Sequence, residues 1–363
     1  MKNRLLELAI QIQQVPAPTN EETLRGQFIA QQLHAEGFPL AQIHTDTAGN
    51  VLACLPGNGS GAPLIISAHM DTVFPMDTVL DIRKDSGRVY GPGIGDNSLG
   101  VAGLFGVIWM LRERGIQMPG DIWFAANTGE EGLGDLRGMK TLVERFGATP
   151  KTYLILEGMA LGHIYNKAVG VQRYKISLHT QGGHSWTDYG KPSAIHELSS
   201  LVTDIANINL PNKPHTTLNV GRISGGTSIN TIAANAWMEL DLRSEEQGSL
   251  AQLISQVEKL VETVRQRDVS VEITPIGQRP PGEINANHPI IGLAQSCLRK
   301  VGIEPVLTIG STDANIPLSK GYPALVLGLT RGGRAHTIHE FIETGEIDQG
   351  LEHLHQFVSR LWD

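Results

Sequence analysis

The feature that most constrains this chain is a series of short apolar segments that each lead into a histidine or an acidic residue. The segments are residues 63–68, 121–126 and 152–156, and the polar residues that follow them are His69, Glu130 and Glu157. Because helical patterns alternate with these expected strands, we predict an α/β fold whose sheet is covered on both faces. Ligands of such sheets bind outside the carboxyl ends of the strands, so these side chains should share one site.

Helix signals frame the predicted sheet. The first helix should end near Val15, just before Pro16, and the pair Thr19 and Glu22 resembles the capped start of a second helix that runs to about Glu36. Further helices are predicted over 98–113, 136–146 and 288–301, and further strands over 43–55 and 324–329.

The pattern changes at about Ala168. From there the expected elements are a strand (169–180), a helix (194–208), two strands (216–224 and 236–243), a helix (248–267) and a strand (270–274). This β-α-β-β-α-β order is similar to that of ferredoxin-like units. We therefore predict a discontinuous three-layer αβα domain, 1–167 and 281–363, with residues 168–280 inserted as a smaller α+β domain.

Composition excludes several classes of protein. The 363-residue chain is 40% hydrophobic and 18% charged, which suits two folded domains, and its formal charge of −8 disfavours nucleic acid as a partner. The longest apolar stretch, 101–111, is about half the length of a membrane span. The two cysteines, Cys54 and Cys297, lack metal-ligand spacing. We expect a cytoplasmic protein that acts on neither membranes nor nucleic acid.

Several polar groups are candidates for a hydrolytic site with two divalent metal ions. His69 and Asp71 lie two apart at a strand end, so the first can bind a metal while the second orients it; the alternative is a polar turn. Asp96 follows a glycine-rich loop and is either a ligand shared by two metals or a helix N-cap. Glu130 and Glu131 repel each other unless a cation holds them, and the alternative is an exposed acidic turn.

Two further candidates lie later in the chain. Glu157 directly follows a buried strand, where a charge usually needs a partner. His336 and His339 lie three apart near an expected helix start, and their spacing does not choose between them. The metal site is indicated by the joint occurrence of these groups.

Taken together, the segments resemble the family of co-catalytic zinc amidohydrolases that contains peptidase T, glutamate carboxypeptidase, acetylornithine deacetylase, succinyl-diaminopimelate desuccinylase and carnosine dipeptidase. The likeness spans nearly the whole chain. It implies that His69 and Glu157 hold one zinc ion, that Glu131 and His336 hold the other, and that Asp96 bridges them. His336 is preferred because it matches the family pattern His-Thr-x-x-Glu-aromatic.

The same resemblance implies that Glu130 is the general base and that Asp71 orients a metal-binding histidine. It also implies a cis peptide bond between Asp96 and Asn97. The chain departs from the family at one point, because many relatives have Asp-x-Lys-Gly where this chain has Asp96-Asn-Ser-Leu-Gly, without the lysine.

Three residues of the inserted domain also match the family. His184 resembles a lid histidine that reaches a neighbouring subunit's site and stabilises an oxyanion, and Asn230 and Arg243 resemble lid residues that hold the substrate's carboxylate. Without the resemblance, His184 would be interpreted as a turn residue and Arg243 as part of a surface ion pair. The resemblance thus implies a homodimer formed through the inserted lid and dimerisation domain.

These assignments imply an enzyme that hydrolyses an amide bond of short peptides, as a di-/tripeptidase or aminopeptidase of the peptidase T kind, with water activated by two zinc ions. The alternative is an N-acyl amino acid deacylase or a carboxypeptidase. Manganese or cobalt can replace zinc in carboxylate-rich sites. A non-catalytic binding protein of this fold would lack the base or a ligand, and all are present here.

Overall fold

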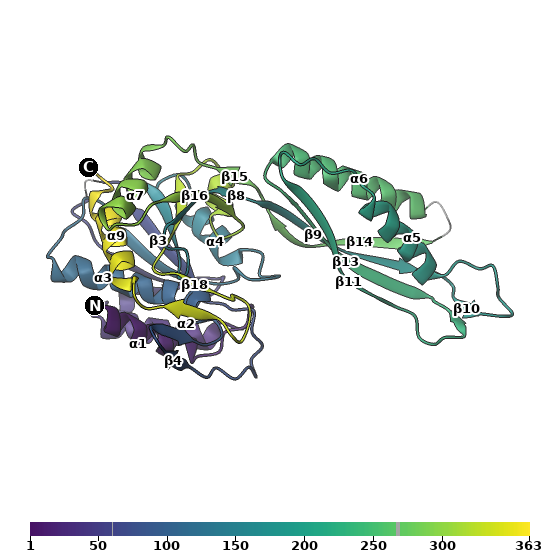
Figure 1. The fold of residues 1–363 in the computed structure, drawn as a ribbon, viewed down its shortest axis with the longest axis horizontal. Helices are drawn as coiled ribbons and strands as arrows, with labels where there is room; N and C mark the ends of the chain where they lie inside the picture. The colour runs from purple at the N-terminus through teal and green to yellow at the C-terminus, as the bar shows by residue number, and fades with distance from the viewer. Residues whose placement is uncertain (60, 266–268) are drawn as a thin grey trace. The chain divides into compact units, whose positions relative to one another are not determined.

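The computed structural model describes residues 1–59, 61–265 and 269–363, and these fall into two compact units (Figure 1). The first unit consists of Met1–Ala168 and Glu283–Asp363, and the second of Val169–Gly282. Each unit is built around its own hydrophobic cluster.

A mixed sheet lies at the centre of the first unit. Its strand order is β1-β2-β6-β3-β7-β17-β8-β15, and β16 also pairs with β8. The inner strands β6, β3, β7 and β17 run parallel to one another, whereas β2 beside β6 and β8 beside β17 are antiparallel to them. The bounds are β1 (Ile43–Thr45), β2 (Val51–Leu55), β3 (Leu64–His69), β6 (Ile122–Asn127), β7 (Thr152–Glu157), β8 (His163–Ala168), β15 (Gly282–Glu283), β16 (Val306–Gly310) and β17 (Ala324–Gly328).

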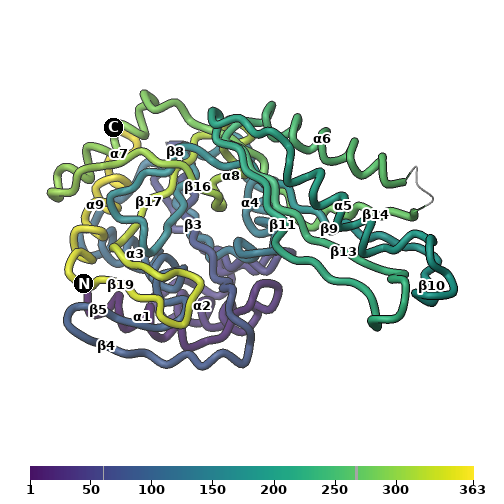
Figure 2. Tube along the Cα trace, turned by 45° about the vertical axis from the view of Figure 1, so that its right-hand side comes forward, coloured from purple at the N-terminus to yellow at the C-terminus, as the bar shows by residue number. Residues whose placement is uncertain are grey.

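Helices cover both faces of this sheet. The connections β3–α3–β6 and β6–α4–β7 step in opposite directions along the sheet, and since such crossovers are right-handed, α3 and α4 lie on opposite faces. Helices α1, α3, α9 and α7 contact one another in that order, and α4 contacts α8; Figure 2 shows α3, α9 and α7 side by side. The predicted three-layer α/β architecture is confirmed. The helices are α1 (Lys2–Gln13), α2 (Thr23–Ala35), α3 (Gly100–Glu113), α4 (Arg137–Phe146), α7 (Pro289–Lys300), α8 (Asn315–Ser319) and α9 (Ile347–Arg360).

The carboxyl ends of β3, β6 and β7 bring polar residues to one edge of the sheet. β3 is buried along its whole length and ends at His69, and β7 ends at Glu157. β6 ends at Asn127, three residues before Glu130. Because the three strands are adjacent and parallel, their terminal residues lie next to one another.

A small second sheet joins the late part of the first unit to an early loop. Its order is β18-β19-β5-β4, with β18 (Gly332–Gly333), β19 (Phe341–Glu343), β5 (Arg88–Tyr90) and β4 (Arg83–Asp85). The sequence pattern does not predict this sheet, and the helix start expected near His336 is wrong. His336 instead lies in the loop between β18 and β19, in a left-handed backbone conformation with φ of 63°.

The second unit has an antiparallel sheet of order β11-β13-β9-β14, with α5 and α6 on one of its faces (Figure 1). The chain order β9-α5-β11-β13-α6-β14 confirms the ferredoxin-like prediction. A separate short antiparallel pair is formed by β10 and β12. The bounds are β9 (Gly170–His179), β10 (Gly183–His184), α5 (Ala194–Ala206), β11 (Thr216–Gly225), β12 (Thr231–Ile232), β13 (Asn235–Ser244), α6 (Gln247–Arg265) and β14 (Ser270–Arg279).

Two sequence expectations about helices need correction. Within the described residues α2 begins at Thr23 with Glu22 at the N-cap position, but no side chain makes a capping hydrogen bond there, and Thr19 lies further outside the helix. The apolar helical stretch is also longer than 101–111: Ile94–Glu113 is long and apolar enough to cross a membrane by composition alone. Since 94% of its apolar window is buried inside the structure, it has the surroundings of a core helix.

Helix α9 contributes a buried histidine that should make stability depend on pH. Nε2 of His353 donates to the carbonyl oxygen of Gly328 at 2.8 Å, and Nδ1 has no partner among the described residues. Burial lowers the pKa of His353 to about 4. The folded state therefore favours the neutral ring.

We expect the stability contributed by neutral His353 to be present above about pH 6.5 and to be lost as the pH falls towards 4, because the unfolded state then binds the extra proton. His353→Gln should remove on the order of 3 kcal/mol of this pH dependence, measured by urea unfolding between pH 4 and 7. His163→Gln, at an exposed position, is the control. An unchanged pH profile in His353→Gln would contradict the prediction.

Candidate metal centre

The carboxylate of Asp96 lies between two imidazoles. Its Oδ1 is 3.2 Å from Nε2 of His69, and its Oδ2 is 3.1 Å from Nε2 of His336. Asp96 has non-helical backbone angles, φ −110° and ψ 86°, and Leu99 rather than Asp96 precedes α3, so the N-cap alternative is wrong. The expected cis peptide bond between Asp96 and Asn97 is present.

Each imidazole also faces a second carboxylate. Oε1 of Glu131 is 3.1 Å from Nε2 of His336, and Oε2 of Glu157 is 3.8 Å from Nε2 of His69. The structure thus brings together the five residues for which the sequence predicts metal binding, although they come from separate parts of the chain.

The spacing and chemistry of these atoms fit divalent cations. Donor atoms of His69, Asp96 and Glu131 all lie within 4.8 Å of one another. Ligands that sit about 2.0–2.2 Å from a shared zinc ion are about 3–3.6 Å apart, close to the separations seen here. Nitrogen and carboxylate donors without thiolate suit zinc, manganese or cobalt.

The electrostatics of the cluster favour a bound cation. Burial alone would lower the pKa of His69, but the surrounding acids raise it well above its usual range. Burial would likewise raise the pKa of Asp96, but His336 and His69 hold it well below its usual range. Burial raises the pKa of Glu157 to about 7, and hydrogen bonds to Asp96 and Glu131 raise that of His336 to about 10. A divalent cation would neutralise the same acids.

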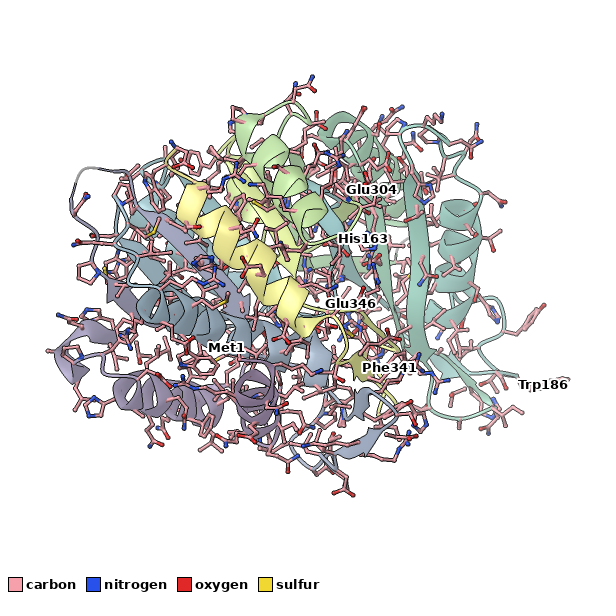
Figure 3. All side chains as sticks on the ribbon, turned by 60° about the vertical axis from the view of Figure 1, so that its left-hand side comes forward. Met1, His163, Trp186, Glu304, Phe341 and Glu346 are labelled. Carbon is pink, nitrogen blue, oxygen red and sulfur yellow. The ribbon has the colours of Figure 1, made fainter. Side chains whose placement is uncertain are left out.

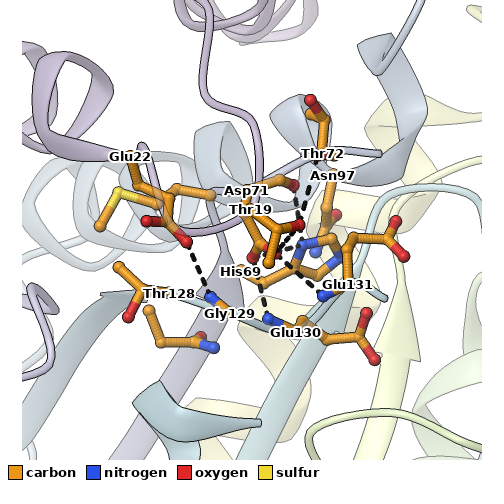
Figure 4. A network of polar contacts seen from close by, with 12 residues as sticks. Thr19, Glu22, His69, Asp71, Thr72, Asn97, Thr128, Gly129, Glu130 and Glu131 are labelled. Carbon is orange, nitrogen blue, oxygen red and sulfur yellow. Dashed lines mark hydrogen bonds and ion pairs between the residues drawn. The ribbon is translucent and has the colours of Figure 1, made fainter. Parts of the chain in front are cut away.

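Asp71 contacts the Nδ1 side of the His69 ring and so orients that ring (Figure 4). Nδ1 of His69 lies 3.1 Å from the carbonyl oxygen of Asp71 and 3.5 Å from its carboxylate Oδ1, so Nε2 is turned towards Asp96. The carboxylate of Asp71 is fully buried, and although burial would raise its pKa, His69 and two backbone N–H groups lower it.

Those N–H groups belong to Glu130 and Glu131. They donate to Oδ1 and Oδ2 of Asp71 at 3.0 and 2.9 Å. Figure 4 shows that both glutamate side chains extend away from Asp71. Each residue is only 6% exposed, so the alternative of an exposed acidic turn is wrong.

Glu340 supports the centre, and the sequence pattern gave it no role beyond a place in the family motif. Its buried carboxylate accepts the N–H groups of Gly93, Gly95 and Asp96 at 3.2, 2.7 and 2.8 Å. Because Glu340 follows the His336 loop, it ties that loop to the loop of Asp96. Burial raises the pKa of Glu340 to about 7.

Asn97 and Asp313 are further supporting residues that sequence reasoning missed. The Asn97 side chain donates to Leu156 O at 2.8 Å and accepts the N–H of Gly158 at 2.9 Å, which fixes both sides of Glu157. Asp313 is fully buried and accepts a 2.7 Å hydrogen bond from Asn127. Neither residue stands in a pattern that distinguishes it from an ordinary loop residue.

The remaining three candidates belong to the second unit. Nδ1 of His184 accepts the N–H groups of Trp186 and Thr187. The side chain of Trp186 is exposed at the surface of the second unit (Figure 3). Asn230 adjoins His184, since the next residue, Thr231, pairs with it.

Arg243 lies elsewhere in the second unit. Its Nε donates to Asp241 at 2.7 Å, as the surface ion-pair alternative expects. His184 pairs with Thr231, and β13 begins four residues later at Asn235. Arg243 lies eight residues further along β13, which corresponds to about 27 Å from Asn235 at 3.4 Å per residue. His184 and Arg243 therefore do not share one pocket within this unit.

The chain is similar to known proteins in sequence and in fold. Residues 65–360 match the model of peptidase family M20/M25/M40. A succinyl-diaminopimelate desuccinylase of Corynebacterium glutamicum is 24% identical over 357 residues, which cover 95% of this chain and 93% of that protein. The structure of aminopeptidase PepT from Bacillus cereus is similar with a TM-score of 0.81 at 23% identity, covering 100% of this chain and 99% of that one. A Staphylococcus aureus tripeptidase gives 0.84 at 21% identity, covering 99% and 98%.

The two histidines of the late loop provide a direct test of the cluster. His336→Ala removes a ring nitrogen that faces both Asp96 and Glu131, so it should weaken zinc binding at one site by at least about 100-fold. His339→Ala, three residues away and exposed, is the matched control and should bind zinc like the unaltered protein. Calorimetric titration of chelator-treated protein measures both. Equal affinities in the two variants would remove His336 from the site.

Proposed function

The chain belongs to peptidase family M20/M25/M40 and is a hydrolase, and we propose that it cleaves an amide bond of short peptides with the help of two divalent metal ions. The observation that carries this proposal is the position of Asp96, whose two oxygens face different histidines. A carboxylate placed in this way can ligate one cation with each oxygen.

The remaining ligands divide between two metal positions. His69 and Glu157 would hold the first cation, and His336 and Glu131 the second, with Asp96 shared. Zinc ions bound there would lower the pKa of water and polarise the scissile carbonyl. Zinc is the metal we propose, and manganese or cobalt fits the same donors.

Glu130 is proposed as the general base. Its N–H is held by Asp71, which fixes the backbone from which its carboxylate extends. The carboxylate would take a proton from the attacking water and give it to the leaving amine. Asp71 acts by holding this turn and the ring of His69, without touching the substrate.

The second unit is proposed as a lid and dimerisation domain. Since Nδ1 of His184 accepts backbone N–H groups, the neutral ring carries its proton on Nε2, which suits donation to an oxyanion. Asn230 and Arg243 are proposed to hold the substrate's carboxylate, and their separation along the unit is consistent with contacts from different subunits of a homodimer. β11 ends the strand order of its sheet and can pair with a second copy.

The preferred substrates are di- and tripeptides with a free terminus. The peptidase fold of the structural neighbours supports this class, whereas the desuccinylase relative supports N-acyl amino acids as the second candidate. A cytoplasmic location is proposed because Cys54 and Cys297 are both free thiols.

Replacing the proposed base separates chemistry from metal binding. Glu130→Gln should retain two metal ions per chain and lose roughly 10²–10⁴-fold in kcat, because the proton acceptor is gone while the proposed ligands remain. Metal content is measured by elemental analysis and kcat by amine release. Glu144→Gln, at an exposed position on α4, is the control. An active Glu130→Gln enzyme would refute the assignment.

The substrate class is tested by a panel of compounds. Di- and tripeptides are compared with N-acetyl and N-succinyl amino acids at equal concentration, and liberated amine is measured. We expect the highest kcat/KM for a peptide. A higher value for an N-acyl amino acid would make the enzyme a deacylase instead.

A further inference from the structure

The segment between α1 and α2, residues 17–22, makes hydrogen bonds with Asp71 and Thr72, beside the candidate metal centre. The N–H of Thr72 donates to Ala17 O at 2.9 Å, and that of Thr19 donates to Thr72 O at 3.2 Å. The hydroxyl of Thr19 donates to Oδ2 of Asp71 at 3.0 Å. The polar side chains that resemble a helix cap are therefore directed to the site.

Glu22 makes the most extensive contacts of this segment. It is 4% exposed, and its Oε1 accepts the N–H groups of Asn20 and Gly129, each at 3.1 Å. Arg137 donates to the same oxygen at 2.5 Å. The ion pair with Arg137 balances the charge of a carboxylate that is otherwise removed from water.

Three successive N–H groups are consequently held by two buried carboxylates (Figure 4). Glu22 holds that of Gly129, and Asp71 holds those of Glu130 and Glu131. Gly129 has φ of 68°, and a Cβ built there would lie 2.3 Å from Nη1 of Arg137. The backbone of this turn is thus fixed in position by Glu22 and Asp71.

We propose that Glu22 is a positioning residue for catalysis, which acts through the Gly129 N–H to aim the carboxylate of Glu130. This inference rests on the proposed function, in which Glu130 is the base. Asp71 holds the N–H groups of both Glu130 and Glu131, and Glu22 adds the contact to Gly129, which directly precedes the base and is one residue farther from the proposed ligand Glu131. A displacement of about 1 Å in a reacting group can cost roughly 100-fold in rate, so small movements of this turn matter.

Variants of Glu22 test the proposal at saturating zinc, with rates normalised to the folded, metal-loaded fraction. Glu22→Ala should lower kcat by tenfold or more with KM within about twofold and two metals retained, because the turn is freed while the ligands remain. Glu22→Gln should recover most of kcat, since its amide oxygen can still accept from Gly129. Glu21→Gln, at the exposed neighbouring position, is the matched control.

Glu22→Asp is the second variant, for the case in which Glu22→Ala does not fold. The aspartate keeps a negative charge beside Arg137, but its side chain is too short to reach the N–H of Gly129. Glu22→Asp should therefore also lower kcat. Normal kcat in the folded Glu22→Ala or Glu22→Asp enzyme, with only the melting temperature lowered, would overturn the inference and leave a structural role. Glu130→Gln is measured in parallel. If that variant is fully active, the proposed function itself fails, whatever Glu22 does.

Discussion

The candidate metal centre depends on one carboxylate, that of Asp96, which lies between two histidines that are distant from each other in the sequence. An acid in this position is stable only if its loop is held and its charge is balanced. Glu340 and Asn97 hold the loop from two sides, one through backbone N–H groups and the other through the strand that ends at Glu157. The fold can therefore be understood as a support for this single side chain.

Both the strands of the central sheet and a set of buried polar side chains hold the site residues in place. The parallel strands carry His69 and Glu157 to one edge of the sheet, and buried polar side chains then fix the loops that follow the strands. Asp71, Glu340 and Glu22 each accept backbone N–H groups from a segment distant in sequence. These buried carboxylates fix the loops around the candidate site through backbone N–H groups, as the outer partners of metal sites commonly do.

Much of this could be predicted because it is local. His69 and Glu157 stand directly after apolar runs, and the β-α-β-β-α-β order of the second unit follows from hydrophobic periodicity. The choice of His336 over His339 needed the family pattern, because spacing alone fits either residue. In the structure Nε2 of His336 lies 3.1 Å from Oδ2 of Asp96.

What could not be predicted is non-local. The pairing of Phe341 with Tyr90 joins two very short strands whose sequences carry no alternation, so the sheet that holds the late loop was not foreseen. Thr19 and Glu22 have the spacing of a helix cap, and only the fold shows that their partners are Asp71 and Gly129. A capping pattern and a site-supporting pattern look the same in one sequence.

The central claim is that two cations share the carboxylate of Asp96. Anomalous diffraction from a crystal of the zinc-loaded protein tests it most directly. We predict two peaks per chain, one between Asp96 and His69 and the other between Asp96 and His336. A single peak, or peaks remote from Asp96, would contradict the account.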